Sequence, residues 1–253
     1  MRAIEAIFLV LPVAAAPFAL RVIPRLVDGV SPAHRVATWL QPIAAAALIT
    51  SFLLPVGALA GALVAPWAAV AILLVVGNAR RARGNLRAGL IFLPFGVVWL
   101  AMARTGVGPP GLAPATVFLG ALHFHFTGFA LQVLLAVVAP ARVIRILPVV
   151  GIPLIAAGNL AHLPPLKAAG VAAVSLGTIA FGVVLVRSGR PPLLRVAGAS
   201  IVAAMLLALL YGAGELCGRG WIAIDHMALA HGLLNAVGFT FLGLVALRRV
   251  SIS

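Results

Sequence analysis

The feature that most constrains this chain is a succession of apolar windows, each long enough to cross a bilayer. An α-helix needs about 20 apolar residues to cross about 30 Å of hydrocarbon. Nine such windows can be marked: Ala3 to Leu20, Val36 to Leu54, Gly57 to Gly77, Leu86 to Ala103, Pro114 to Val138, Val143 to Ala161, Leu166 to Val186, Val196 to Ala213 and His226 to Leu247. Hydrophobic residues make up 64% of the chain and charged residues 9%, which excludes a soluble domain. The sequence predicts an all-α, polytopic transmembrane helix bundle, with residues 1–253 as a single integral membrane domain.

The basic residues predict the orientation of this bundle. Alternate loops are rich and poor in Lys and Arg, as the positive-inside rule requires of cytoplasmic and external loops. Of the 18 basic residues, fourteen fall in one set of loops, and the other set holds only Arg2, Arg104, Lys167 and Arg219. We therefore expect the N-terminus outside, the C-terminus in the cytoplasm, and a first window that stays attached as a span. The net charge of +14 then reflects topology and contacts with anionic lipid, and we expect no nucleic acid partner.

Two histidines stand near the middle of the fifth window. The stretch Leu119–Gln132 contains His123 and His125, and a polar side chain at that depth is costly unless it serves a site, a partner or a water-filled cavity. Further polar residues gather toward the window ends opposite the arginine-rich loops: Asn159, His162, Tyr211, Glu215, Asp225, His226, His231 and Asn235. This concentration predicts a site that opens to the extracytoplasmic half of the bilayer.

Helical spacing divides these residues into stripes. Residues four apart share a helix face, so His231, Asn235 and then Gly238 form one stripe. His123 and His125 are two apart and must point in different directions. One of them faces the site while the other bonds to a neighbouring helix, or the two serve adjacent compartments. A single intramembrane histidine is about as often a helix-to-helix hydrogen-bond partner as a catalyst.

Two motifs carry a family resemblance. The segments HFHFTGF at 123–129 and MALAHGLLNAVGF at 227–239 resemble the paired motifs of the YndJ-like family of bacterial integral membrane proteins. This resemblance implies a multi-pass protein of the bacterial inner (plasma) membrane, and it implies little about mechanism.

A second resemblance is local. The segment Ala121–Phe126 is similar to a haem-ligand helix of cytochrome c oxidase subunit I, and Ala230-His231-Gly232 is similar to the partner ligand helix of that family. The two helices come in the reverse order here, and the copper-site histidine pair is absent. The similarity implies haem binding by two histidines, whereas these two differences disfavour an oxidase.

The residues favour an enzyme as the first hypothesis. It would perform acid–base chemistry on a membrane lipid or another hydrophobic small molecule, such as epoxide opening, isomerisation, or cyclisation of an isoprenoid or polyketide chain. Glu215 or Asp225 would be the acid, and His123, His125 or His231 would orient it or act as the base. The substrate would be held by Asn159, His162, Tyr211, His226 and Asn235. This hypothesis needs no cofactor and no metal.

Two other classes stay open. A haem or a transition metal (Zn, Cu or Fe) would be ligated by His123, His125 and His231, with His162 and His226 as further ligands, in an oxidoreductase or an assembly factor. A transporter or lipid-binding protein is the third class, although we detect no inverted repeat of the kind that transporters often contain.

Overall fold

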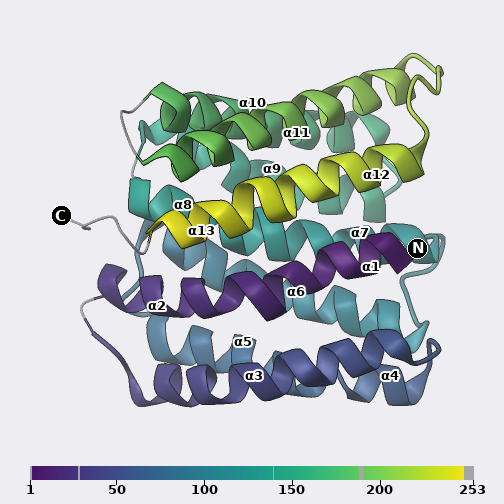
Figure 1. Ribbon diagram of the computed structural model, residues 1–253. Helices are drawn as coiled ribbons and strands as arrows, with labels where there is room; N and C mark the ends of the chain where they lie inside the picture. The colour runs from purple at the N-terminus through teal and green to yellow at the C-terminus, as the bar shows by residue number, and fades with distance from the viewer. Residues whose placement is uncertain (1, 28, 139, 188–190, 248–253) are drawn as a thin grey trace. The chain divides into compact units, whose positions relative to one another are not determined.

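The computed structural model describes residues 2–27, 29–138, 140–187 and 191–247. Within these ranges the chain is all α-helical apart from π-helical segments, turns and short connections, and nine stretches are long and apolar enough to cross a membrane (Figure 1). They are Ala3–Leu26, Pro32–Leu53, Ala58–Asn78, Gly84–Thr105, Pro114–Val138, Arg142–Leu160, Pro164–Arg187, Pro192–Gly214 and Ile224–Leu247. The prediction of nine spans is therefore confirmed, and the chain is a multi-pass membrane protein. The direction in which the termini face stays a prediction.

Several spans begin earlier than their apolar windows because a proline stands in the first turn. The helices α3 (Pro32–Leu53), α10 (Pro164–Arg187) and α11 (Pro192–Leu216) start at a proline before the predicted window, and α7 (Pro114–His123) starts at the proline with which its window began. Proline suits this position because the N–H that it lacks would have no helical partner there. In α3 the hydroxyl of Ser31 also accepts a hydrogen bond from the His34 N–H, at 3.0 Å.

Three spans contain a π-helical segment. In the first span η1 (Val10–Ala15) joins α1 (Arg2–Leu9) to α2 (Ala16–Leu26). In the fifth span η2 (Phe124–Ala130) joins α7 to α8 (Leu131–Val138). In the ninth span η3 (Leu234–Phe241) joins α12 (Ile224–Leu233) to α13 (Leu242–Leu247). A π turn shifts the backbone hydrogen bonds by one residue and often marks a functional site. The apolar windows predicted plain helices here.

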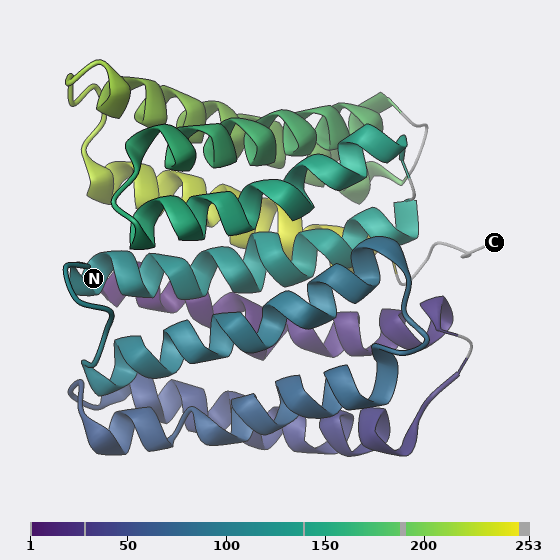
Figure 2. The ribbon, with the colours of Figure 1, turned by 180° about the vertical axis from the view of Figure 1, so that it is seen from behind.

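Contacts divide the chain into two compact units, which we describe separately. The N-terminal unit comprises residues 8–137. In it α3 packs against α5 (Ala65–Asn78), α5 against α6 (Gly84–Thr105), and α6 against α7, η2 and the short α4 (Ala58–Ala62). The C-terminal unit comprises residues 1–7 and 138–249. In it α9 (Arg142–Leu160) packs against α10, α10 against α11, and α11 against α12, η3 and α13. The teal-green α9 and green α10 lie side by side in Figure 2.

Glycine sets the close approach of α10 and α11 in the C-terminal unit. A Cβ added to Gly182 would lie 2.7 Å from the carbonyl oxygen of Gly198, and one added to Gly198 would lie 2.6 Å from that of Gly182. The two backbones therefore meet where only glycine fits. Small residues of this kind let membrane helices gain van der Waals contact in the absence of a hydrophobic driving force.

Candidate functional site

His125 lies inside the N-terminal unit with none of its surface exposed. Its Nδ1–H donates to the carbonyl of Ala121 at 2.8 Å, and its Nε2 accepts a hydrogen bond from the indole N–H of Trp67 at 2.9 Å. Gly96 on α6 leaves room for the ring, since a Cβ there would lie 2.7 Å from Nδ1. The edge of the Phe8 ring contacts the imidazole, with centroids 4.9 Å apart. His125 thus joins η2 to α5, and both ring nitrogens are engaged.

His123 has a different environment two residues earlier. It is half-buried at the end of α7, and its Nδ1 lies 2.7 Å from the Leu119 carbonyl oxygen. A carbonyl can only accept, so we assign a proton to Nδ1. The expectation that His123 and His125 point in different directions therefore holds. His125 bonds to a neighbouring helix through Trp67, and its catalytic role stays a prediction.

His231 is half-buried on α12 in the C-terminal unit. Its Nδ1 lies 2.8 Å from the carbonyl oxygen of Ala204 on α11, which again places a proton on Nδ1. One turn later Asn235 is buried in η3, and a Cβ added to Gly238 would lie 2.6 Å from the Ser200 hydroxyl. His231 and Gly238 of the predicted stripe thus both lie against α11.

The other predicted site residues of the C-terminal unit lie toward the connections between helices. Tyr211 is half-buried, and its place seven residues after Ala204 sets it on the same face of α11, about 10 Å further along. Asn159 is half-buried near the end of α9. Three residues are exposed: His162, which has a positive φ of 53° in the turn after α9, and Asp225 and His226 at the start of α12. Glu215 belongs to α11, and its side chain lies outside the described part of the structure.

The described residues contain no group of three or more His, Cys, Asp or Glu side chains that could hold a metal ion. The predicted site residues also belong to two units: His123 and His125 to the N-terminal unit, the rest to the C-terminal unit. Their convergence on one pocket therefore stays a prediction.

Three buried polar residues of the N-terminal unit were not predicted as a group, and each bonds to a carbonyl near a proline: Gln41, His34 and Arg104. In the π register of η1, the Ala16 N–H bonds to the Leu11 carbonyl, so the Pro12 carbonyl would bond to residue 17. That residue is Pro17, which has no N–H. The side-chain amide of Gln41 donates to the Pro12 carbonyl instead, at 2.6 Å. Gln41 therefore replaces a donor that the backbone lacks.

His34 likewise bonds to a carbonyl that lacks a backbone donor, in this case that of Leu20 further along α2. The Leu20 carbonyl would bond to residue 24 in an α-helix, and that residue is Pro24. The His34 ring lies with Nε2 2.9 Å from this carbonyl oxygen, which assigns the proton to Nε2. Its Nδ1 then accepts from the Asn78 amide at 3.2 Å. His34 therefore links α2, α3 and α5 by hydrogen bonds.

Arg104 is the third such residue and was expected in a loop. The structure places it in the last turn of α6 with 4% of its surface exposed. Its Nη2 donates to the carbonyls of Ser51 at 2.6 Å and Leu54 at 2.9 Å, and the guanidinium lies over the Phe52 ring at 4.8 Å. Pro55 has no N–H for the Ser51 carbonyl, which accepts a 3.3 Å hydrogen bond from the Leu54 N–H in addition to that from Arg104. A cation at the C-terminal end of α3 also suits the helix dipole.

Both sequence motifs coincide with a change from α to π helix. The first motif begins at the last residue of α7 and continues through η2, and the second continues from α12 into η3. The described fold is thus that of a polytopic α-helical membrane protein with one histidine motif in each unit.

Comparison with known families agrees with these motifs. The YndJ-like protein family matches residues 6–239, nearly the whole length, and the chain belongs to this family. Comparison with curated proteins and with solved structures gave no match.

Proposed function

We propose that the protein is an integral membrane enzyme that performs acid–base chemistry on a lipidic substrate, with His231 as the group that moves the proton. The observation that carries this proposal concerns the Ala204 carbonyl. Ala204 lies inside the uninterrupted helix α11, and the residue four positions later, Ala208, has an N–H to offer it. The hydrogen bond from His231 is therefore not needed by the backbone. It orients the imidazole instead.

This orientation suits proton transfer. With Nδ1–H held by the carbonyl, Nε2 is the ring nitrogen that would take a proton from a substrate hydroxyl or carbon and later return it. Asn235 lies one turn further along the same span, where an amide can hold a substrate oxygen. In epoxide opening, an acid such as Asp225 or Glu215 would protonate the oxygen as the C–O bond breaks. Nε2 would remove a proton from a neighbouring carbon or from water.

A lipidic substrate follows from the position of the histidine. His231 belongs to a span, so its reaction partner has to reach it within the bilayer or its interface. The same reasoning applies separately to His123 in the N-terminal unit, whose Nδ1 is held by Leu119. Tyr211, Asn159, His162 and His226 belong to the proposed substrate-binding set by the sequence pattern alone.

The second candidate is haem or a transition metal bound through Nε2. Histidines that bind metals usually donate Nδ1–H to a carbonyl or carboxylate, and His123 and His231 both make this bond. The ring nitrogens of His125 are both engaged, so His125 is the weakest candidate ligand in the structure.

The test compares the wild type with His231→Gln and His123→Gln. Lipid extracts of cells that express each protein would be compared by mass spectrometry, and folded protein would be quantified. We expect a lipid product that the wild type forms and His231→Gln does not, while His34→Gln forms it in proportion to its folded amount. Equal product from His231→Gln and wild type would overturn the assignment. A Soret band or stoichiometric metal that His231→Gln lacks would favour the second candidate over the enzyme.

A further inference from the structure

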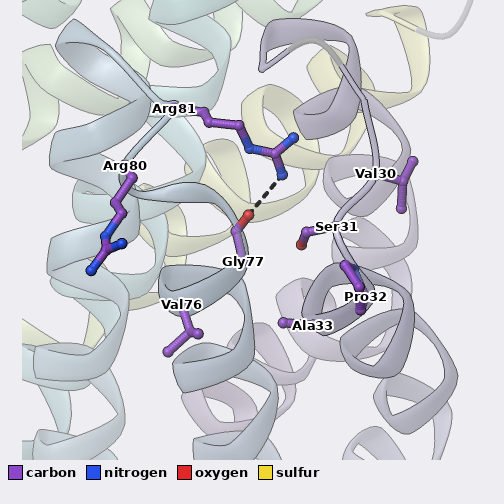
Figure 3. Close-up of a pocket in the computed structure, with 8 residues that line it drawn as sticks. All are labelled: Val30, Ser31, Pro32, Ala33, Val76, Gly77, Arg80 and Arg81. Atoms are coloured by element: carbon purple, nitrogen blue, oxygen red, sulfur yellow. Dashed lines mark hydrogen bonds between the residues drawn. The ribbon is translucent and has the colours of Figure 1, made fainter.

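A cavity of about 700 Å³ lies in the N-terminal unit where α5 ends and α3 begins. Its lining combines apolar side chains with two cations: Val30, Ser31, Pro32, Ala33, Val76, Gly77, Arg80 and Arg81 (Figure 3). None of these residues is acidic. The cavity stands at the ends of two spans, Pro32–Leu53 and Ala58–Asn78, and therefore at the level of the membrane interface.

Close packing builds the floor of this cavity. A Cβ added to Gly77 would lie 3.1 Å from the His34 backbone nitrogen and 3.2 Å from the Ala33 Cβ, so the end of α5 rests directly on the start of α3. The Ser31 hydroxyl is already engaged as the N-cap of α3. The remaining polar groups that the lining offers to a ligand are therefore mainly the two guanidinium groups.

A hydrogen bond to the protein holds the Arg81 side chain in place. Its Nη2 donates to the Gly77 carbonyl at 2.8 Å, which fixes the guanidinium over the C-terminal end of α5. Figure 3 shows Arg81 turned toward the side of the cavity that carries Ser31, while Arg80 extends to the other side of the α5 end. Both side chains are exposed. One hydrogen bond to the protein leaves most of the N–H donors of Arg81 for an outside acceptor.

We propose that this cavity binds the phosphate of an anionic phospholipid headgroup, with Arg81 as the principal contact and Arg80 as a second cation. Guanidinium groups match phosphate oxygens with paired N–H donors. Val30, Pro32 and Val76 supply an apolar wall for the glycerol and the start of an acyl chain. The arginine-bearing ends of the spans are also those that the positive-inside rule assigns to the cytoplasmic leaflet, where anionic lipids attract basic groups.

The test measures lipid retained by the full-length protein purified from mixed vesicles of phosphatidylglycerol and phosphatidylcholine. We expect Arg81→Gln to lower the retained phosphatidylglycerol about tenfold relative to phosphatidylcholine, as loss of a charge-assisted hydrogen bond predicts. Arg80→Gln should have a smaller effect. The control Arg87→Gln removes the same charge from an exposed residue near the start of α6 and should change retention less than about twofold.

Two further arms make the result decisive. Val76→Trp fills the cavity without changing the charge and should also lower retention, since Val76 is 71% exposed and its replacement does not disturb the core. Inorganic phosphate is tested as a competitor. Arg81-dependent binding of inorganic phosphate with no preference for phosphatidylglycerol would overturn a lipid ligand in favour of a free anion. An equal loss in Arg87→Gln and Arg81→Gln would overturn the site itself.

Discussion

The link between Pro17 and Gln41 gives the sharpest test of how the N-terminal unit is stabilised. The Pro12 carbonyl has no backbone donor in the π register because residue 17 is a proline, and Gln41 supplies the donor from α3. Gln41→Leu keeps the approximate size of the side chain and removes the donor. Pro17→Ala restores a backbone N–H. We therefore expect Gln41→Leu to cost little stability in a protein that also carries Pro17→Ala.

The expected magnitude follows from burial and geometry. Gln41 is 5% exposed and its amide lies 2.6 Å from the Pro12 oxygen, so its loss leaves a carbonyl without a donor in an apolar interior. An unsatisfied buried group costs about 1–3 kcal/mol, whereas hydrogen bonds between membrane helices average about 0.6 kcal/mol. The greater apolarity of leucine offsets part of the loss. We expect Gln41→Leu to lower the free energy of unfolding by about 1–2 kcal/mol, and by less than about 0.5 kcal/mol in the Pro17→Ala background.

Unfolding in mixed detergent micelles, followed by tryptophan fluorescence, measures these differences. Pro24→Ala is the matched control because its restored N–H would serve Leu20 and not Pro12. The full cost of Gln41→Leu should therefore persist in that background. An equal cost of Gln41→Leu with and without Pro17→Ala would refute the explanation, and so would rescue by Pro24→Ala.

Two further predictions concern packing within each unit. Trp67→Phe removes the hydrogen-bond donor to His125 Nε2 at a buried site, so we expect the free energy of unfolding to fall by about 1–3 kcal/mol. The control Trp39→Phe changes a residue that is 83% exposed and should leave the free energy of unfolding unchanged in the same assay. Gly182→Ala would bring a Cβ to 2.7 Å from a backbone oxygen of α11, so thermal unfolding should show a loss of stability of about 1–3 kcal/mol. The control is Gly212→Ala, where the nearest atom to an added Cβ is 3.7 Å away. If both variants lose the same stability, close packing at Gly182 is refuted.

The spans could be predicted because length and apolarity are local properties. Their starts moved because prolines such as Pro32 and Pro192 extend a helix beyond its apolar window. The alternation of arginine-rich and arginine-poor loops supported the count of spans. It did not predict which arginines are buried, as Arg104 shows. Its position in a charge-poor end suggested a loop residue, whereas its partners Ser51 and Leu54 lie about 50 residues away in the sequence.

The partners of buried polar groups could not be predicted because they depend on which helices lie opposite each other. Gln41 is 29 residues from Pro12, and no spacing rule connects them. Prolines within the apolar windows gave a weaker signal of where such partners are needed. A proline inside an apolar window leaves a carbonyl without its donor one turn earlier, so a polar residue elsewhere is needed to bond to it. Pro17 and Pro24 fit this rule, whereas no proline marks η2 or η3.

This rule also separates two kinds of polar residue within the spans. His34 and Gln41 bond to carbonyls that prolines leave without donors, so the backbone itself explains why they are there.

His123 and His231 differ, because the residues four positions after Leu119 and Ala204 are not prolines and each has its own N–H. The proposed function gives a reason for the solvation cost of placing these imidazoles in a span. We therefore expect His34→Gln to lower stability, and His231→Gln to lower activity while the free energy of unfolding stays near that of the wild type. The opposite pattern would place the histidine of the second motif among the structural residues.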